Sequence, residues 1–299
     1  GCHNILRTTA RAVVEADVRN VLGMVYSSID DTERARLNYR RALELRRSAL
    51  GDLHPQTLDS IHHLGKFQFD SHELEAAKVL FEEALAGTRR TLGENHKDTY
   101  NAMNDLAVVL NHLGEAEAAL PLQIEALAGY KEVLGDDHPD TLKTMVNTAA
   151  LLRQMGRVEE AEPYYRTALH GLRRSLGDRH PDTMTCINNM GALMRSLGKD
   201  EEAERYYRQA LQLRVEVLGA DHFATLLSVN NLAGVLLDLE RIQEVAAILE
   251  NNLPAARERW QGTGLLGVYL TKWGTAQSRR QQFTEAEETL TEAHTLLSE

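Results

Sequence analysis

Apolar residues recur along most of the chain at the three- and four-residue spacing of amphipathic helices. In one stretch this spacing predicts a helix from Met184 to about Leu197, which Gly198 ends. A second helix is expected to begin near Lys199. Its apolar face consists of Ala203, Tyr207, Ala210 and Leu211. The pattern therefore predicts pairs of helices, here called helix A and helix B of a repeat.

A short phrase, Leu-Gly-x-x-His-(Pro)-x-Thr, separates consecutive helix pairs and recurs every 42 residues. Its glycines are Gly51, Gly93, Gly135, Gly177 and Gly219. Self-similarity at such a period marks a solenoid, in which each unit buries its apolar face by stacking on its neighbours. We therefore expect an all-α solenoid of about seven antiparallel helix pairs. Its extended surface favours binding over catalysis.

Each residue of the phrase has an expected structural role. Glycine ends helix B in a left-handed conformation, proline stops the helix from continuing, and Thr57 and its equivalents cap the next helix A. The recurring histidines are expected to hydrogen-bond the turn. One imidazole per repeat, about 10 Å from the next, spreads the ligands too far for a metal site. Pro121 and Pro163 are expected near the start of helix B, where a missing N–H costs least.

Charge and cysteine content exclude some classes of protein. The net charge of −11 argues against a general binder of nucleic acid or anionic membrane. The two cysteines, Cys2 and Cys186, predict neither a disulfide scaffold nor a Cys-rich metal site, and they fit a cytoplasmic location. No run of 18 apolar residues and no signal peptide is visible. Because the chain starts with glycine inside a helical pattern, we expect it to be a piece of a longer protein.

Catalytic signatures are missing from the sequence. It contains no Gly-rich phosphate loop, no nucleophile elbow and no HExxH motif. The adjacent histidines His62 and His63 are neighbours on a helix and do not face each other, so they do not predict a metal site. We expect no enzyme activity, no catalytic residues, no metal and no cofactor.

The repeat resembles the tetratricopeptide repeat, which is usually about 34 residues long. Its small-residue, Ala, Tyr and Ala-Leu positions match Gly191, Ala203, Tyr207 and Ala210-Leu211. The 42-residue length is similar to that of kinesin light chain repeats. It also resembles the arrays behind nucleotide-binding or kinase domains in fungal and bacterial signalling proteins. The resemblance covers the chain from about Ala16 and implies a right-handed superhelix. We expect one domain, 1–299, with repeats at about 16–57, 58–99, 100–141, 142–183, 184–225, 226–266 and 267–299.

In tetratricopeptide arrays helix A lines a concave groove, so the resemblance also indicates where a ligand would lie. Asparagine recurs just before the small residue of helix A, although it is a poor helix former. Its amide offers a donor and an acceptor, which suits the backbone of an extended peptide. Alternatively, it bonds to the next repeat. Basic residues on the same face favour a partly acidic peptide. The predicted peptide-binding residues are Asn104, Lys143, Asn147, Arg153, Asn188, Asn189, Arg195, Asn230, Asn231 and Lys272.

The leading hypothesis is a non-enzymatic scaffold that binds an extended, partly acidic peptide or disordered segment in this groove. An alternative is self-assembly through the uncapped solenoid ends or the convex face, because free solenoids need polar caps. A related alternative is the sensor arm of a larger signalling protein of the nucleotide-binding or kinase type. Under all of these, we expect a protein or peptide partner and neither nucleic acid nor membrane.

Overall fold

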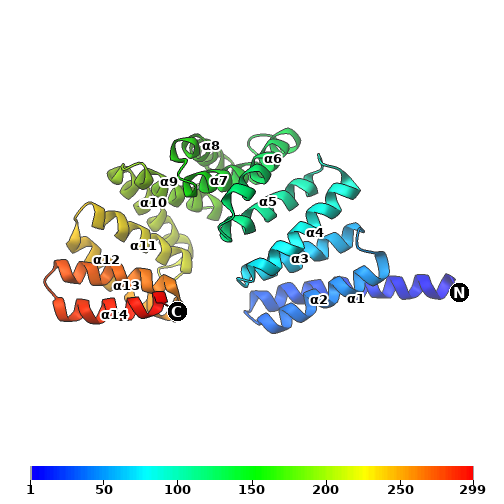
Figure 1. Cartoon of the computed structure of the whole chain (residues 1–299), viewed down its shortest axis with the longest axis horizontal. Coiled ribbons are helices and arrows are strands. Elements are labelled where there is room, and N and C mark those ends of the chain that lie inside the picture. The colour runs from blue at the N-terminus through cyan, green and yellow to red at the C-terminus, as the bar shows by residue number, and fades with distance from the viewer. Residues whose placement is uncertain (1, 299) are drawn as a thin grey trace. The chain divides into compact units, whose positions relative to one another are not determined.

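The structure, a computed structural model, describes the backbone of residues 2–298 and the side chains of residues 8–298. In this part of the chain it consists of fourteen α-helices without a strand (Figure 1). They are α1 (Cys2–Ser28), α2 (Thr32–Leu50), α3 (Pro55–Asp70), α4 (Leu74–Leu92), α5 (Lys97–His112), α6 (Ala116–Leu134), α7 (Pro139–Gln154), α8 (Val158–Leu176), α9 (Pro181–Ser196), α10 (Asp200–Leu218), α11 (Phe223–Asp238), α12 (Ile242–Arg259), α13 (Gly264–Arg279) and α14 (Phe283–Ser298). Odd-numbered helices are the A helices and even-numbered helices are the B helices.

The chain divides into two compact units, and the boundary falls between Leu151 and Leu152, inside α7. Within each unit, consecutive helices pack side by side, such as α3 on α4 and α9 on α10 (Figure 1). This arrangement confirms the predicted all-α helical repeat solenoid.

Small residues on the A helices let the B helices pack closely. A Cβ atom added to Gly191 would lie 2.8 Å from the ring of Tyr207, and one added to Gly23 would lie 2.8 Å from the ring of Tyr39. Ala203, at the key alanine position of helix B, is fully buried. The small and apolar residues that recur in each repeat therefore form the contact surface between helix A and helix B.

The histidine of the repeated phrase caps the A helices, so the prediction that threonine does so is wrong. His54 precedes the first residue of α3, and its Nδ1 atom accepts a hydrogen bond from the backbone N–H of Gln56 at 3.2 Å. Thr57 lies inside the first turn, fully buried, and its Oγ1 donates to the Gly51 carbonyl at 2.8 Å. The same histidine contact recurs at His96, His138, His180 and His222. A-helices therefore begin earlier than predicted, at Pro181 rather than Met184.

The roles of glycine and proline in the structure differ in part from those predicted from the sequence. The phrase glycines have positive φ, as predicted, but Gly51 has ψ 166°, an extended region open essentially to glycine alone. Pro55 does not block helix B, which has already ended, but supplies the first residue of α3. Pro121 and Pro163 lie near the helix start, as expected, but they are the sixth residues of α6 and α8. They therefore lie beyond the first turn, where a missing N–H costs least.

The structure also bears on membrane spans, metal sites and the state of the cysteines. The described helices include none long and apolar enough to span a membrane. Among the described side chains, no three His, Cys, Asp or Glu residues converge on a possible metal position. Cys186 is buried as a free thiol, and burial raises its pKa to about 12. The side chain of Cys2 and the last residue, Glu299, lie outside the described part.

Candidate functional site

Amide side chains on neighbouring A helices hydrogen-bond one another. Asn147 Nδ2 donates to Asn104 Oδ1 at 3.3 Å, and Asn231 Nδ2 donates to Asn188 Oδ1 at 3.2 Å. Asn104 Oδ1 also accepts from Gln123 on the B helix α6 at 3.0 Å. These asparagines therefore tie one repeat to the next. An amide offers two donors and two acceptor positions. Asn188 and Asn231 each use one polar atom in their bond. Asn104 Oδ1 accepts twice and its Nδ2 donates to Asp105 at 3.4 Å, which leaves Asn104 one donor for a ligand.

Asn189 differs from the other asparagines of this face. It is half-buried, and its side chain has no hydrogen bond to another residue within 8–298. An amide that is partly shielded from water and unbonded loses hydration without compensation, unless water or a ligand supplies a partner. Asn189 is thus the amide of this face with the most unused capacity.

Basic side chains gather on the A helices of the second unit, and we call Arg153, Arg195 and Lys272 the cationic cluster. Lys272 Nζ donates to Asn230 Oδ1 at 2.5 Å. Burial, together with the positive charge of Arg195, lowers the pKa of Lys272 to about 8. Arg195 is paired with Asp238 at 2.5 Å. The cluster thus holds a lysine whose charge is poorly compensated, close to a second cation.

Two buried tyrosines lie beside the cluster. The Nε atom of Arg153 and the hydroxyl of Tyr165 are both buried without a hydrogen-bond partner within the described residues. Burial raises the pKa of Tyr207 to about 12, although the charges of Arg195 and Arg153 oppose this rise. The tyrosines stay neutral, so their hydroxyls can donate hydrogen bonds to an acceptor.

A cavity of about 280 Å³ opens on the A helices of the first unit. Phe69, Phe81, Val108 and Val109 provide apolar walls. Its polar lining is Lys66, Lys143, Asn104, Asn147, Asp105, His62 and His112. Three predicted peptide-binding residues, Asn104, Lys143 and Asn147, therefore share one hollow.

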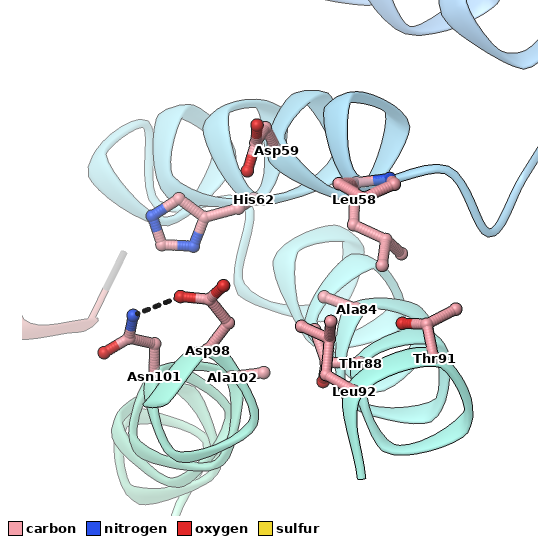
Figure 2. Close-up of a pocket in the computed structure, with 11 residues that line it drawn as sticks. Leu58, Asp59, His62, Ala84, Thr88, Thr91, Leu92, Asp98, Asn101 and Ala102 are labelled. Carbon is pink, nitrogen blue, oxygen red and sulfur yellow. Dashed lines mark hydrogen bonds between the residues drawn. The ribbon is translucent and has the colours of Figure 1, made fainter. Parts of the chain in front are cut away.

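A smaller cavity of about 130 Å³ lies between α3, α4 and α5, and Figure 2 shows its lining. Asp59 and His62 extend from α3 above Asp98 and Asn101 of α5, while Thr88 comes from α4 (Figure 2). The residue 42 positions after Thr88 is Tyr130, whose hydroxyl donates to Asn101 Oδ1 at 2.5 Å. Thr88 thus lines this cavity at a position where the next repeat has the larger tyrosine.

His62 lines both cavities and forms an ion pair with Asp105, which lines the larger one. The Nδ1 atom of His62 lies 3.0 Å from Asp105 Oδ2. This hydrogen bond to Asp105 raises the pKa of His62 above 6.5, against the effect of burial. The pair contributes stability that is fully present below pH 6.5 and is lost as the pH rises through the folded-state pKa of His62. Burial instead lowers the pKa of His63, which favours its neutral form.

The structure thus places the ten predicted residues in two groups. Asn104, Lys143 and Asn147 line the cavity of the first unit, and the others lie on A helices of the second unit. The prediction missed Phe69 and His112 of the cavity, whose rings contact each other at 5.0 Å. They lie 43 residues apart, as do Asn104 and Asn147, so a search at this spacing could have found them.

A comparison with family models settles the kind of repeat. The tetratricopeptide repeat model matches residues 14–90, 98–171, 146–216 and 186–258. The chain belongs to the tetratricopeptide repeat family. Tetratricopeptide repeats imply a protein-interaction scaffold, and the family is a non-catalytic one. No curated protein sequence matches the chain.

Solved structures resemble this tetratricopeptide array in fold. Repeats of a putative kinesin light chain from Podosopora anserina share 19% identity, cover 68% of this chain and 96% of their own, and give a TM-score of 0.57. Rap protein complexed with Competence and Sporulation Factor shares 15% identity, covers 100% of this chain and 93% of its own, and gives 0.62. NprR in complex with its cognate peptide NprX shares 16% identity, covers 96% and 79%, and gives 0.60.

Proposed function

We propose that this tetratricopeptide array binds an extended, partly acidic peptide or disordered segment along the face of its A helices. The cationic cluster carries the proposal. Lys272 is half-buried beside Arg195, and both desolvation and like charge disfavour its protonated form. A peptide carboxylate placed there would compensate that charge by charge-assisted hydrogen bonds.

The asparagine side chains on the A helices can hydrogen-bond a peptide backbone. Asn189 is unbonded within the described residues, and Asn188 and Asn231 each use only one polar atom in their mutual bond. Donors and acceptors on one face match the alternating N–H and C=O groups of an extended chain. The similar folds of Rap and NprR, solved with a factor and a peptide, are consistent with this use of the fold.

In the first unit, the cavity of about 280 Å³ suits a side chain of a peptide bound to that unit. Phe69 and Phe81 offer it an apolar wall, while Lys66 and Lys143 lie at its polar lining. Lys143 is exposed and has no ion pair with a described residue, so it can meet an acidic group.

A peptide array of varied acidity, screened against the whole chain, would supply a ligand for quantitative tests. By fluorescence anisotropy, the double substitution Asn189→Ala and Arg195→Ala should weaken a hit peptide about tenfold or more. Arg257→Ala is the control, because Arg257 lies on the B helix α12 and pairs with Glu292. Equal affinity of the double variant and the control would refute binding on the A-helix face.

The proposal also predicts how binding depends on pH. Because the pKa of Lys272 is lowered to about 8, its charge disappears within an accessible pH range. The affinity for an acidic peptide should fall as the pH rises through about 8, since the lysine becomes neutral. Lys272→Arg keeps its charge in this range and should lack the fall. A wild-type affinity that does not change between pH 7 and pH 9.5 would contradict the role of Lys272.

Self-association is a second candidate function, favoured by the exposed side of α1. Val14, Val18, Val21 and Val25 follow helical spacing and are 62%, 53%, 54% and 50% exposed. A second copy of the array could stack on this stripe, as repeats stack on each other. Val18→Glu with Val21→Glu should then abolish dimers in sedimentation velocity. A wild-type chain that is monomeric at every concentration would rule this candidate out for the chain.

A further inference from the structure

Two arginines occupy the same buried position in two repeats. Arg46 lies on α2 and Arg214 on α10, four 42-residue intervals apart, and each is 6% exposed. Uncharged residues hold this position in four other repeats: Thr88, Tyr130, Leu172 and Ala256. A guanidinium is costly to bury, so its presence at this position calls for partners.

Both arginines make the same two hydrogen bonds. Arg46 Nη1 donates to the Gln56 carbonyl at 2.7 Å and to Ser60 Oγ at 2.9 Å. Arg214 Nη1 donates to the Ala224 carbonyl at 2.9 Å and to Ser228 Oγ at 2.8 Å. The partners correspond one to one at the 42-residue register, so the two guanidinium groups are held in matching ways.

The two sites differ at the other end of the guanidinium. Arg46 Nη2 donates to Asp17 Oδ1 at 2.5 Å, and the side chain of Asp17, on the A helix α1, is 51% exposed. The residue at the register position of Asp17 beside Arg214 is Thr185, on the A helix α9. Arg214 has no ion pair with a residue in the described part of the chain, and burial alone lowers its pKa.

We propose that Arg214 binds a carboxylate of the peptide ligand at the position that corresponds to Asp17 beside Arg46. The inference rests on the proposed function and adds a second, separate acid-binding point to the cationic cluster. The exposed position of Asp17 in the matching site shows that such a carboxylate can be reached from solvent. Thr185 is itself exposed and too short to fill the place with a charged oxygen.

The position of Thr185 on α9 also indicates how this point relates to the rest of the face. Thr185, Asn188 and Asn189 are separated by three and four residues and share one side of the helix. Arg195 lies ten residues after Thr185, a rise of about 15 Å along the helix. One A helix therefore offers an acid-binding point near each end with the amides between them. A peptide with two carboxylates at a comparable separation fits this arrangement.

The sharpest test supplies the missing carboxylate from the protein itself. Thr185→Asp should reproduce the Asp17–Arg46 pair, raise the melting temperature of the free chain, and occupy the proposed site. The probe is octaglutamate, acetylated, amidated and fluorescein-labelled, so that every register offers a carboxylate. Thr185→Asp should weaken its binding about tenfold, while the neutral Thr185→Asn should leave binding near the wild-type level.

A double-mutant cycle separates occupation of Arg214 from general repulsion by the added charge. In an Arg214→Gln background, Thr185→Asp should have no further effect on octaglutamate binding. If Thr185→Asp leaves binding unchanged, or weakens it equally without Arg214, the inference is overturned. If Arg214→Gln does not fold, the melting temperature decides instead: Thr185→Asp should melt higher than Thr185→Asn because it pairs with Arg214, and the absence of this rise would overturn the inference.

Two further comparisons are needed. One distinguishes a side-chain carboxylate from the C-terminal carboxylate of the peptide, and the other distinguishes failure of this inference from failure of the proposed function. Octaglutamate with a free C-terminus should bind no more than about twofold tighter than the amidated form if side-chain carboxylates are recognised. A much larger gain in affinity would show that Arg214 binds the C-terminal carboxylate of the peptide. Binding that is lost on substituting Asn189 and Arg195 but unaffected by Thr185→Asp would overturn this inference while keeping the proposed function. Failure of wild type to bind octaglutamate would overturn both.

Discussion

Histidine is the residue that defines the start of the A helices. Each phrase histidine accepts a backbone N–H two residues later through Nδ1, the contact that Ser, Thr, Asp or Asn usually makes at a helix N-cap. Threonine, three residues further on, is buried in the first turn instead. Thr57 anchors this turn to the glycine that ends the preceding helix B. The phrase is therefore a hydrogen-bonded turn that connects helix B of one repeat to helix A of the next.

His180→Ala should test the cap, because it removes the side-chain acceptor for the Asp182 N–H at the start of α9. We expect a loss of about 1 kcal/mol in the free energy of unfolding, measured with urea. His180→Asn should retain most of the stability, since an asparagine side chain can accept the same bond. An equal loss in the two variants would show that the imidazole acts by packing and not as a cap.

Helices meet their neighbours at two characteristic sequence separations. Side chains on adjacent A helices pair 43 residues apart, as in His62–Asp105 and Arg195–Asp238. Charged pairs between adjacent B helices or their N-caps lie 35 to 37 residues apart: Arg47–Glu83, Lys78–Glu115, Arg208–Glu244, Arg241–Glu204 and Arg257–Glu292. Because water screens these exposed pairs, they stabilise the fold little and mainly neutralise one another's charge. In the cationic cluster Arg195 pairs with Asp238, whereas Arg153 and Lys272 have no ion pair with a described residue.

Close helix packing can be tested at Gly129 in α6. A Cβ atom added there would lie 2.0 Å from Tyr100 Cζ of α5, so Gly129→Ala should force the tyrosine to move. We expect a loss of about 1–3 kcal/mol in chemical unfolding. Gly264→Ala is the matched control, because nothing lies within 4 Å of its Cβ and its backbone is helical. A variant at Gly129 as stable as the control would contradict the packing described.

At the scale of the whole chain, stability is built from contacts between neighbouring helices. The α12 helix, for example, packs on α11 and α13, and the buried Leu249 belongs to it. In such an array, a repeat is stabilised by its own helices and by its nearest neighbours. A local defect should therefore stay local.

Leu249→Ala tests this expectation, because it leaves a cavity that should cost about 2–5 kcal/mol. Hydrogen–deuterium exchange read by mass spectrometry should show faster exchange in α11 to α14. Exchange in α1 to α5 should match the wild type. A uniform increase along the chain would instead indicate that the whole array unfolds as one cooperative unit.

Much of the fold could be predicted because each repeat has the same helix packing, so the same residue types recur at the same positions. Gly191 and Tyr207, or Gly23 and Tyr39, are recognisable as a small residue facing a large one at a fixed spacing. The site was harder to predict. Asn188 and Asn231 could each face a ligand or the next repeat, and the spacing within one helix does not distinguish these uses.

The sequence by itself determined the helix pairs, their period and the face on which polar and basic residues gather. It could do so because helical periodicity and glycine stops are local properties. Only the tertiary structure decided which residues meet across repeats, since this depends on how the helices stack. It showed that asparagines bridge neighbouring A helices and that Lys272 lies near Arg195. It also showed that Arg214 lacks the carboxylate that Arg46 has, because desolvation and pairing arise only when the chain folds.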